Sequence, residues 1–72
     1  MIAYVSTNNK GKLNLRAEPS INAKVLVQIP YGKQVNIESV EGEWSKITYE
    51  QYNGYVKSEF LSTSSGVTKQ DL

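Results

Sequence analysis

Hydrophobic and polar residues alternate in short runs along most of the chain, with turn-forming residues between the runs. The alternation is clearest at residues 13–16, 24–29 and 34–38. Successive side chains of a strand point to opposite faces, so this alternation indicates strands with one face against a core. No apolar period of three to four residues continues long enough for a standard helix. The pattern therefore predicts an all-β chain.

Shorter segments complete the expected strands. Residues 2–5, 44–49 and 55–57 read as strands, and residues 58–61 suit a single 3₁₀ turn. Asn53-Gly54 is a strong hairpin signal, and we expect Gly54 to adopt a positive φ there. Five or six short strands would leave two long edges in water as an open sheet, so we expect them to close into a small barrel.

The inward positions of these strands define the expected core. Within residues 44–49, if Ile47 points inward, Tyr49 shares its face and Trp44 lies on the opposite face, unless a bulge breaks the alternation. The predicted core residues are Val5, Leu13, Leu15, Val25, Val27, Ile29, Val35, Ile37, Ile47, Val56 and Leu61.

The composition removes most catalytic chemistry from consideration. The 72 residues include no histidine and no cysteine, which excludes the usual nucleophilic systems and zinc sites that depend on them. Glu38, Glu41 and Glu43 suggest paired carboxylates, but a barrel this small has no enclosed cleft to raise a carboxylate pKa. A net charge of +1 supplies no basic surface for nucleic acid. We therefore expect no enzyme activity, no metal, no cofactor and no nucleic-acid partner.

The two ends of the chain carry no targeting signal. The start lacks the basic and apolar regions of a signal peptide, and no segment has the ~20 apolar residues of a membrane span, so no membrane insertion is expected. From Ser62 onward the residues are small and polar, as in a linker. We expect one monomeric domain at residues 1–62 and a flexible tail at residues 63–72, cut from a longer protein. A free-standing small protein is the alternative.

Three sequence pieces follow one another in a specific order. They are Leu13-Asn14-Leu15-Arg16, Gly42-Glu43-Trp44-Ser45-Lys46-Ile47 and Gly54-Tyr55-Val56-Lys57-Ser58-Glu59-Phe60-Leu61. In this order and spacing the chain resembles the bacterial Src homology 3 (SH3) domain, from about Ala3 to Ser62. The resemblance implies a small SH3-like barrel of five to seven short strands. It also implies a module, fused to secreted cell-wall hydrolases, that holds the enzyme on the stem or bridge peptides of peptidoglycan.

The end of the chain is also similar to the eukaryotic SH3 domain. In that family a tryptophan, a tyrosine, a proline and a final tyrosine form the groove for proline-rich peptides. Trp44, Tyr55 and Phe60 match three of those positions, but Lys57 stands where the proline would be. The departure favours a charged peptide over a proline-rich one.

Seven aromatic residues in so short a chain need a role. We expect Trp44, Tyr55 and Tyr4 to point outward and contact a ligand, whereas Tyr31 and Tyr52 cover the ends of the barrel. For Trp44 the alternative is that it packs under a loop and enlarges a thin core.

Two polar residues and one further aromatic residue complete the predicted site. Asn14 and Arg16 share the polar face of one strand, where Arg16 can hold a ligand carboxylate in a bidentate contact or instead pair with Glu18. Phe60 either contacts the ligand or anchors the final turn.

These features favour a non-catalytic binding module of a secreted or surface bacterial protein, located outside the cell or at the cell wall. Its expected partner is a peptidoglycan stem or bridge peptide. The alternatives are a protein–protein or intramolecular module that docks on the catalytic domain of its parent, and a structural spacer. The predicted ligand-binding residues are Trp44, Tyr55, Tyr4, Asn14, Arg16 and Phe60.

Overall fold

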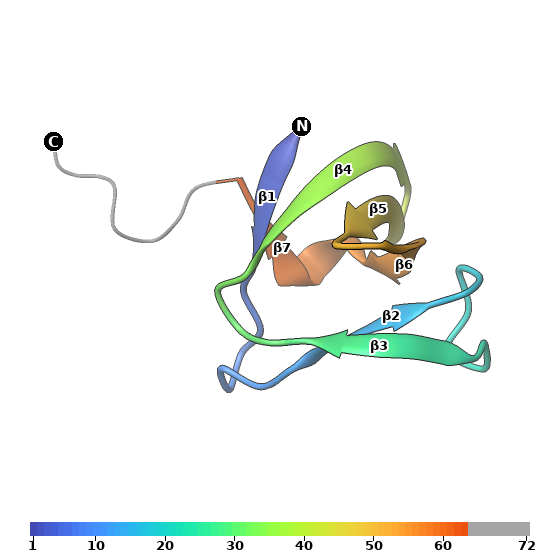
Figure 1. Cartoon of the computed structure of the whole chain (residues 1–72), viewed down its shortest axis with the longest axis horizontal. Helices are drawn as coiled ribbons and strands as arrows, with labels where there is room; N and C mark the ends of the chain where they lie inside the picture. Colours follow the sequence, from blue (N-terminus) through green and yellow to red (C-terminus); the bar gives the residue numbers. More distant parts are fainter. Residues whose placement is uncertain (64–72) are drawn as a thin grey trace, which may run out of the picture.

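Seven antiparallel strands and one 3₁₀ turn form the fold in the computed structural model, which describes residues 1–63 (Figure 1). The elements are β1 (Ile2–Val5), β2 (Leu13–Arg16), β3 (Val25–Ile29), β4 (Gln34–Glu41), β5 (Trp44–Tyr49), β6 (Tyr52–Lys57), η1 (Ser58–Phe60) and β7 (Leu61–Ser62). The predicted strands and the predicted 3₁₀ turn are confirmed, and β4 extends further than its alternating residues indicated.

All seven strands belong to one sheet with the order β3-β2-β6-β5-β4-β1-β7. Figure 1 shows the β2–β3 hairpin on the opposite side of the molecule from β1 and β4, so the sheet curls around its own interior. This arrangement confirms the all-β class and the small SH3-like barrel. Within residues 1–63, no helix is long and apolar enough to cross a membrane.

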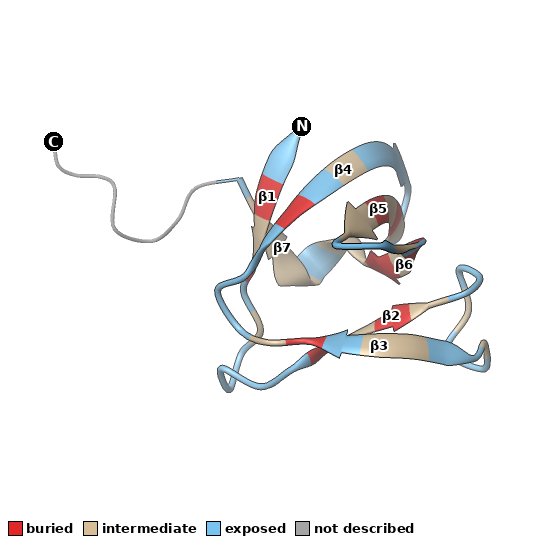
Figure 2. Ribbon diagram, viewed as in Figure 1, coloured by how far each residue is buried: buried red, intermediate tan, exposed pale blue. Residues whose placement is uncertain are grey.

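The core follows the alternation of the strands. Alternate residues of β1, β2 and β5 are buried, and their neighbours lie nearer the surface (Figure 2). The buried hydrophobic residues are Ala3, Val5, Leu13, Leu15, Ile29, Val35, Ile47 and Val56. Val27, Ile37 and Leu61 are half-buried and pack against this cluster, as does Tyr49. The predicted core is therefore confirmed except at Val25.

Val25 was expected in the core and is instead 38% exposed. In β3 it pairs with Arg16, whereas Val27 pairs with Leu15, so two steps along β3 face one step along β2. The extra residue is a β-bulge, and it moves Val25 onto the outward face that Arg16 occupies. The alternation within residues 24–29 alone does not reveal this bulge, which explains why the prediction for Val25 was wrong.

Gly54 has a structural role, but the predicted reason for it is wrong. The hairpin between β5 and β6 turns at Glu50 and Gln51, where Glu50 has a φ of 54°, and Tyr49 pairs with Tyr52. Gly54 lies inside β6 and is not among the glycines with positive φ. A Cβ at Gly54 would collide with the carbonyl oxygen of Arg16 and lie 3.3 Å from its carbonyl carbon. The residue must be glycine because the backbone of β2 crosses β6 here.

The last strand, β7, ends at Ser62. The tail predicted at residues 63–72 lies outside the described residues except for Thr63. The boundary between domain and tail therefore stays a prediction.

The crossing of β2 and β6 can be tested with two glycine substitutions. Gly54→Ala places a methyl group against backbone that cannot move aside, so we expect it to lower the free energy of unfolding by about 2–3 kcal/mol. Gly11→Ala is the matched control, because a Cβ at Gly11 has no atom within 4 Å and its φ is not positive. Urea denaturation followed by tryptophan fluorescence measures both. Equal stability of the two variants would contradict the close crossing.

Candidate functional site

A groove with a cavity volume of about 550 Å³ opens on the outer face of the barrel. Its walls come from the loop before β2, from β2 itself, from the loop between β2 and β3, and from the junction of β5, β6 and η1. Apart from Gly11, the lining residues are polar (Thr7, Asn8, Asn9, Asn14), charged (Lys12, Arg16, Lys57, Glu59) or apolar (Leu13, Ile21, Trp44, Phe60). Segments far apart in the sequence therefore build one surface.

Trp44 begins β5 and is half-buried in the groove. Ser45 and Ile47 on the same strand are buried, so the alternation of β5 turns Trp44 away from the core, as predicted. Across the sheet Trp44 pairs with Lys57, whose Nζ lies 5.5 Å from the centroid of the indole ring. This distance is within the range of a cation–π contact, so the ring and the ammonium group hold each other in place.

Arg16 and Asn14 reach the groove from β2. Arg16 Nη1 donates a hydrogen bond of 3.0 Å to the carbonyl oxygen of Ala23, which ties the loop between β2 and β3 to the strand. Asn14 Oδ1 accepts a hydrogen bond of 3.0 Å from Gln28 Nε2 on β3. Among the described residues the one ion pair joins Lys57 to Glu43, so Arg16 does not pair with Glu18. Its guanidinium group keeps further donors for a ligand.

Phe60 and Ile21 supply the apolar part of the groove together with Trp44. Phe60 is half-buried, lines the groove and also packs against the core, so its position is compatible with both roles considered for it. Ile21 is 69% exposed in the loop between β2 and β3. An exposed isoleucine and a half-buried tryptophan that line the same groove provide apolar surface for a ligand to cover.

Two of the predicted site residues do not line the groove. Tyr55 pairs with Arg16 on one side and Lys46 on the other, so it shares the outward face of β6 with Lys57. Tyr4 lies on β1, where it pairs with Gln34 and Ser62. The groove thus brings together four of the six predicted residues, namely Trp44, Asn14, Arg16 and Phe60.

Lys57 lines the groove although it is not among the six predicted ligand-binding residues; the sequence indicated its position only through the match to the proline of the eukaryotic SH3 groove. Tyr55 and Lys57 are two residues apart in β6 and therefore share a face, but the partner of Lys57 depends on the position of the hairpin turn. A two-residue turn at Asn53-Gly54 would have placed Lys57 opposite Glu50. The observed turn at Glu50 places it opposite Trp44.

The charges of the groove are not balanced. Three of its lining side chains are basic (Lys12, Arg16 and Lys57) and one, Glu59, is acidic. The whole chain has eight basic and seven acidic residues, so the groove concentrates positive charge that the chain as a whole lacks. This imbalance favours an anionic ligand.

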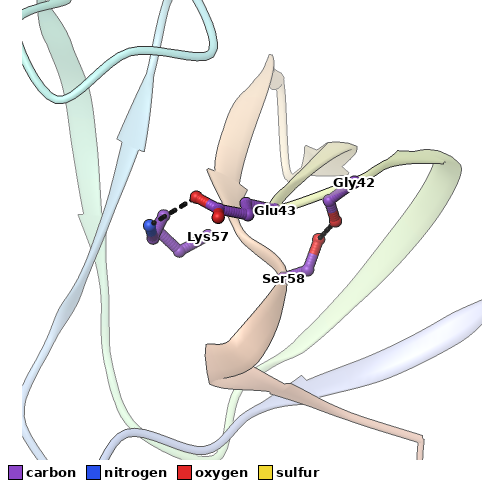
Figure 3. A network of polar contacts seen from close by, with 4 residues as sticks. All are labelled: Gly42, Glu43, Lys57 and Ser58. Atoms are coloured by element: carbon purple, nitrogen blue, oxygen red, sulfur yellow. Dashed lines mark hydrogen bonds and ion pairs between the residues drawn. The ribbon is translucent and has the colours of Figure 1, made fainter.

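The turn between β4 and β5 is fixed against the start of η1 by Ser58 (Figure 3). The Ser58 amide donates to the carbonyl oxygen of Glu43 at 2.8 Å, and Ser58 Oγ donates to the carbonyl oxygen of Gly42 at 3.1 Å. Ser58 Oγ also lies 2.7 Å from Oγ of the buried Ser45. The network places Glu43 beside Lys57, with 3.5 Å between Oε1 and Nζ.

The carboxylates offer no catalytic arrangement among residues 1–63. Glu38 accepts hydrogen bonds from Thr48 and Asn53, and Glu41 accepts one from Ser39. Glu43 pairs with Lys57, so the three glutamates considered for acid–base work have separate partners. The described residues contain no group of three or more histidine, cysteine, aspartate or glutamate side chains placed to hold a metal ion.

Tyr49, at the end of β5, lies outside the groove. Loss of hydration raises the pKa of Tyr49 above its ordinary value of 10.0, and the charge of Glu50 together with a hydrogen bond to it acts in the same direction. Tyr49 therefore stays neutral at physiological pH and packs against the core.

The chain is similar to known bacterial proteins over the segment that forms the groove. The sequence model of the family described as "Bacterial SH3 domain" matches residues 11–62. The "Probable endopeptidase p60" of Listeria innocua is 35% identical over 65 residues, which cover 83% of this chain and 14% of that protein. The "Putative N-acetylmuramoyl-L-alanine amidase YrvJ" of Bacillus subtilis is 26% identical over 65 residues, covering 90% of this chain and 12% of that protein. The chain thus spans about an eighth of the length of these relatives.

The Ser58 network can be tested by a double-mutant cycle. Ser58→Ala removes the contact of the buried Ser45 hydroxyl, so we expect a loss of about 1–3 kcal/mol in the free energy of unfolding. The double variant Ser45→Ala with Ser58→Ala should cost less than the sum of the single variants by about 0.5–1.5 kcal/mol. Ser6→Ala, at an exposed serine, is the control and should be neutral. Strict additivity in urea denaturation would show that the two hydroxyls do not interact.

Proposed function

Because the chain belongs to the bacterial SH3 domain family, we propose that it is a non-catalytic binding module that holds a cell-wall hydrolase on the peptides of peptidoglycan. The observation that carries this proposal is the groove that Trp44, Phe60, Arg16 and Asn14 line together. It combines an aromatic floor with polar groups for a peptide backbone and basic groups for peptide carboxylates.

The relatives support the class of parent protein. One is named as a putative N-acetylmuramoyl-L-alanine amidase and the other as a probable endopeptidase. The segment similar to this chain is about an eighth of each of them, which leaves ample chain for a separate catalytic domain. We infer that the parent of this domain works outside the cell or at the cell wall, where peptidoglycan is accessible.

The groove suits an extended peptide better than an enclosed small molecule. Trp44 offers a rigid apolar face, and Ile21, in the loop between β2 and β3, lines the same groove. Tyr55 flanks Arg16 on the same outward face, so it would contact a peptide long enough to leave the groove. Tyr4 does not line the groove, and it has no part in this proposal.

One groove of this size binds weakly, because the ordering of a flexible peptide opposes the small area that it covers. Attachment to a hydrolase makes weak binding useful, since peptidoglycan presents many copies of the same peptide. Each contact keeps the enzyme at high effective concentration near the next site.

A sedimentation assay with purified peptidoglycan tests the proposal. Trp44→Ala should raise the dissociation constant obtained from the bound fraction by about tenfold or more, since it removes the largest apolar side chain of the groove. Tyr31→Ala is the matched control, because Tyr31 is exposed and lies outside the groove.

Circular dichroism establishes that each variant is folded. Full binding by a folded Trp44→Ala variant would refute the site. Absence of binding by the wild-type chain would refute the function and favour docking on the parent's catalytic domain or a spacer.

A further inference from the structure

We propose that Lys57 selects peptides that carry a free carboxylate, and that Glu43 is a built-in competitor for the same ammonium group. This inference rests on the proposed peptide binding and adds the chemistry that the groove selects. Three features support it: the position of Lys57, its weak ion pair with Glu43, and the excess of positive charge around it.

Lys57 is held at the wall of the groove by contacts on two sides. Its Nζ lies 5.5 Å from the centroid of the Trp44 ring and 3.5 Å from Oε1 of Glu43. The side chain is 29% exposed, so the ammonium group is oriented but still open to solvent. A lysine ammonium has three donors, and neither the ring nor one distant carboxylate oxygen satisfies all of them. A ligand that lies against Trp44 therefore meets a positioned cation with donors to spare.

The existing partner of Lys57 is easily replaced. Glu43 is 84% exposed, and its contact with Lys57 is long for a charge-assisted hydrogen bond. Exposed pairs of this kind contribute little free energy. A ligand whose apolar part covers the indole face of Trp44 can place a carboxylate beside Lys57, less exposed to water than Glu43 is, and there its interaction with the ammonium group is stronger.

The backbone holds the residue that carries the competing carboxylate next to Lys57. Ser58 binds the carbonyl oxygens of Gly42 and Glu43, so the turn that carries the Glu43 side chain is anchored next to β6 (Figure 3). Only the side chain of Glu43 must rotate away to release Lys57. The Glu43 carboxylate therefore occupies the position that a ligand carboxylate takes, and little free energy is needed to displace it.

Other charges around Lys57 reinforce the preference. Arg16 and Lys12 line the same groove, and Arg16 uses one nitrogen for the Ala23 carbonyl oxygen. Glu59 lines the groove as well, and together with Glu43 and Lys57 it borders a smaller recess of about 210 Å³. A neutral peptide leaves this excess of positive charge uncompensated, whereas a peptide carboxylate reduces it.

The test compares two ligands that differ only in charge. One is the disaccharide tetrapeptide released from peptidoglycan with its peptide carboxylates free, and the other is the same compound with those carboxylates converted to primary amides. Tryptophan fluorescence of the whole 72-residue chain reports binding of each, because Trp44 is its one tryptophan. We expect the wild-type chain to bind the free acid about tenfold more tightly than the amide.

Two charge-neutralising variants separate the roles of Lys57 and Glu43. Lys57→Gln should reduce the preference for the free acid to about twofold or less, with little change in binding of the amide. Glu43→Gln should strengthen binding of the free acid about two- to fivefold and leave the amide unaffected.

Two matched controls remove the same charges elsewhere. Lys46→Gln removes a positive charge from the neighbouring strand outside the groove, and Glu41→Gln removes a negative charge from the same hairpin as Glu43. Both controls should retain the wild-type preference.

Three outcomes would overturn the inference. Equal affinity of the wild-type chain for acid and amide would show that the groove does not select a carboxylate, although peptide binding itself would stand. An equal loss of affinity for the acid and the amide in Lys57→Gln would show that Lys57 acts by packing against Trp44 and not by binding a carboxylate. Weaker binding of the free acid by Glu43→Gln would show that Glu43 supports the site. Failure of the wild-type chain to bind either ligand would instead refute the proposed function.

Discussion

The groove depends on the close crossing of β2 over β6 at Gly54. The pairing of Arg16 with Tyr55 is the backbone link between the β2–β3 hairpin and the rest of the sheet. It exists because Gly54 has no Cβ to meet the Arg16 carbonyl oxygen. The link brings Arg16 to the face that carries Trp44 and Lys57. A steric constraint at one glycine therefore determines whether β2 and the residues of β5 and β6 form one groove.

A second consequence of the sheet is that stability and binding use different faces of the same strands. In β5 the buried Ile47 belongs to the core, while Trp44 three residues earlier lies in the groove. In β2 the buried Leu15 separates Asn14 from Arg16. The outward residues can therefore change without loss of the core, and one barrel can acquire different ligand preferences. Phe60 and Leu13 are exceptions, because Phe60 packs against the core, Leu13 belongs to it, and both line the groove.

Local pattern was enough to predict the strands, most of the core and the outward face of Trp44, because each depends on the alternation within a single strand. The errors arose where the pairing between strands decides the outcome. The bulge that exposes Val25 is visible only in its register with β2. Asn53-Gly54 has the composition of a turn, yet Gly54 is required by a strand that is distant in sequence. Misplacing that turn also hid the contact between Lys57 and Trp44, since only the true register sets the two residues opposite each other. The groove could therefore be predicted in part, as four residues without the contact of Trp44 with Lys57.

Nuclear magnetic resonance mapping of the ligand surface tests the central claim most directly. The 72-residue chain, labelled with ¹⁵N, would be titrated with the disaccharide tetrapeptide of peptidoglycan. If peptide binds in the groove, the indole N–H signal of Trp44 and the amide signals of Asn14, Arg16 and Lys57 shift together and saturate with one dissociation constant. The signals of Tyr31 and Val40, which are exposed outside the groove, stay in place. Shifts centred on Tyr31 and Val40, or no shifts at saturating peptide, would contradict the account.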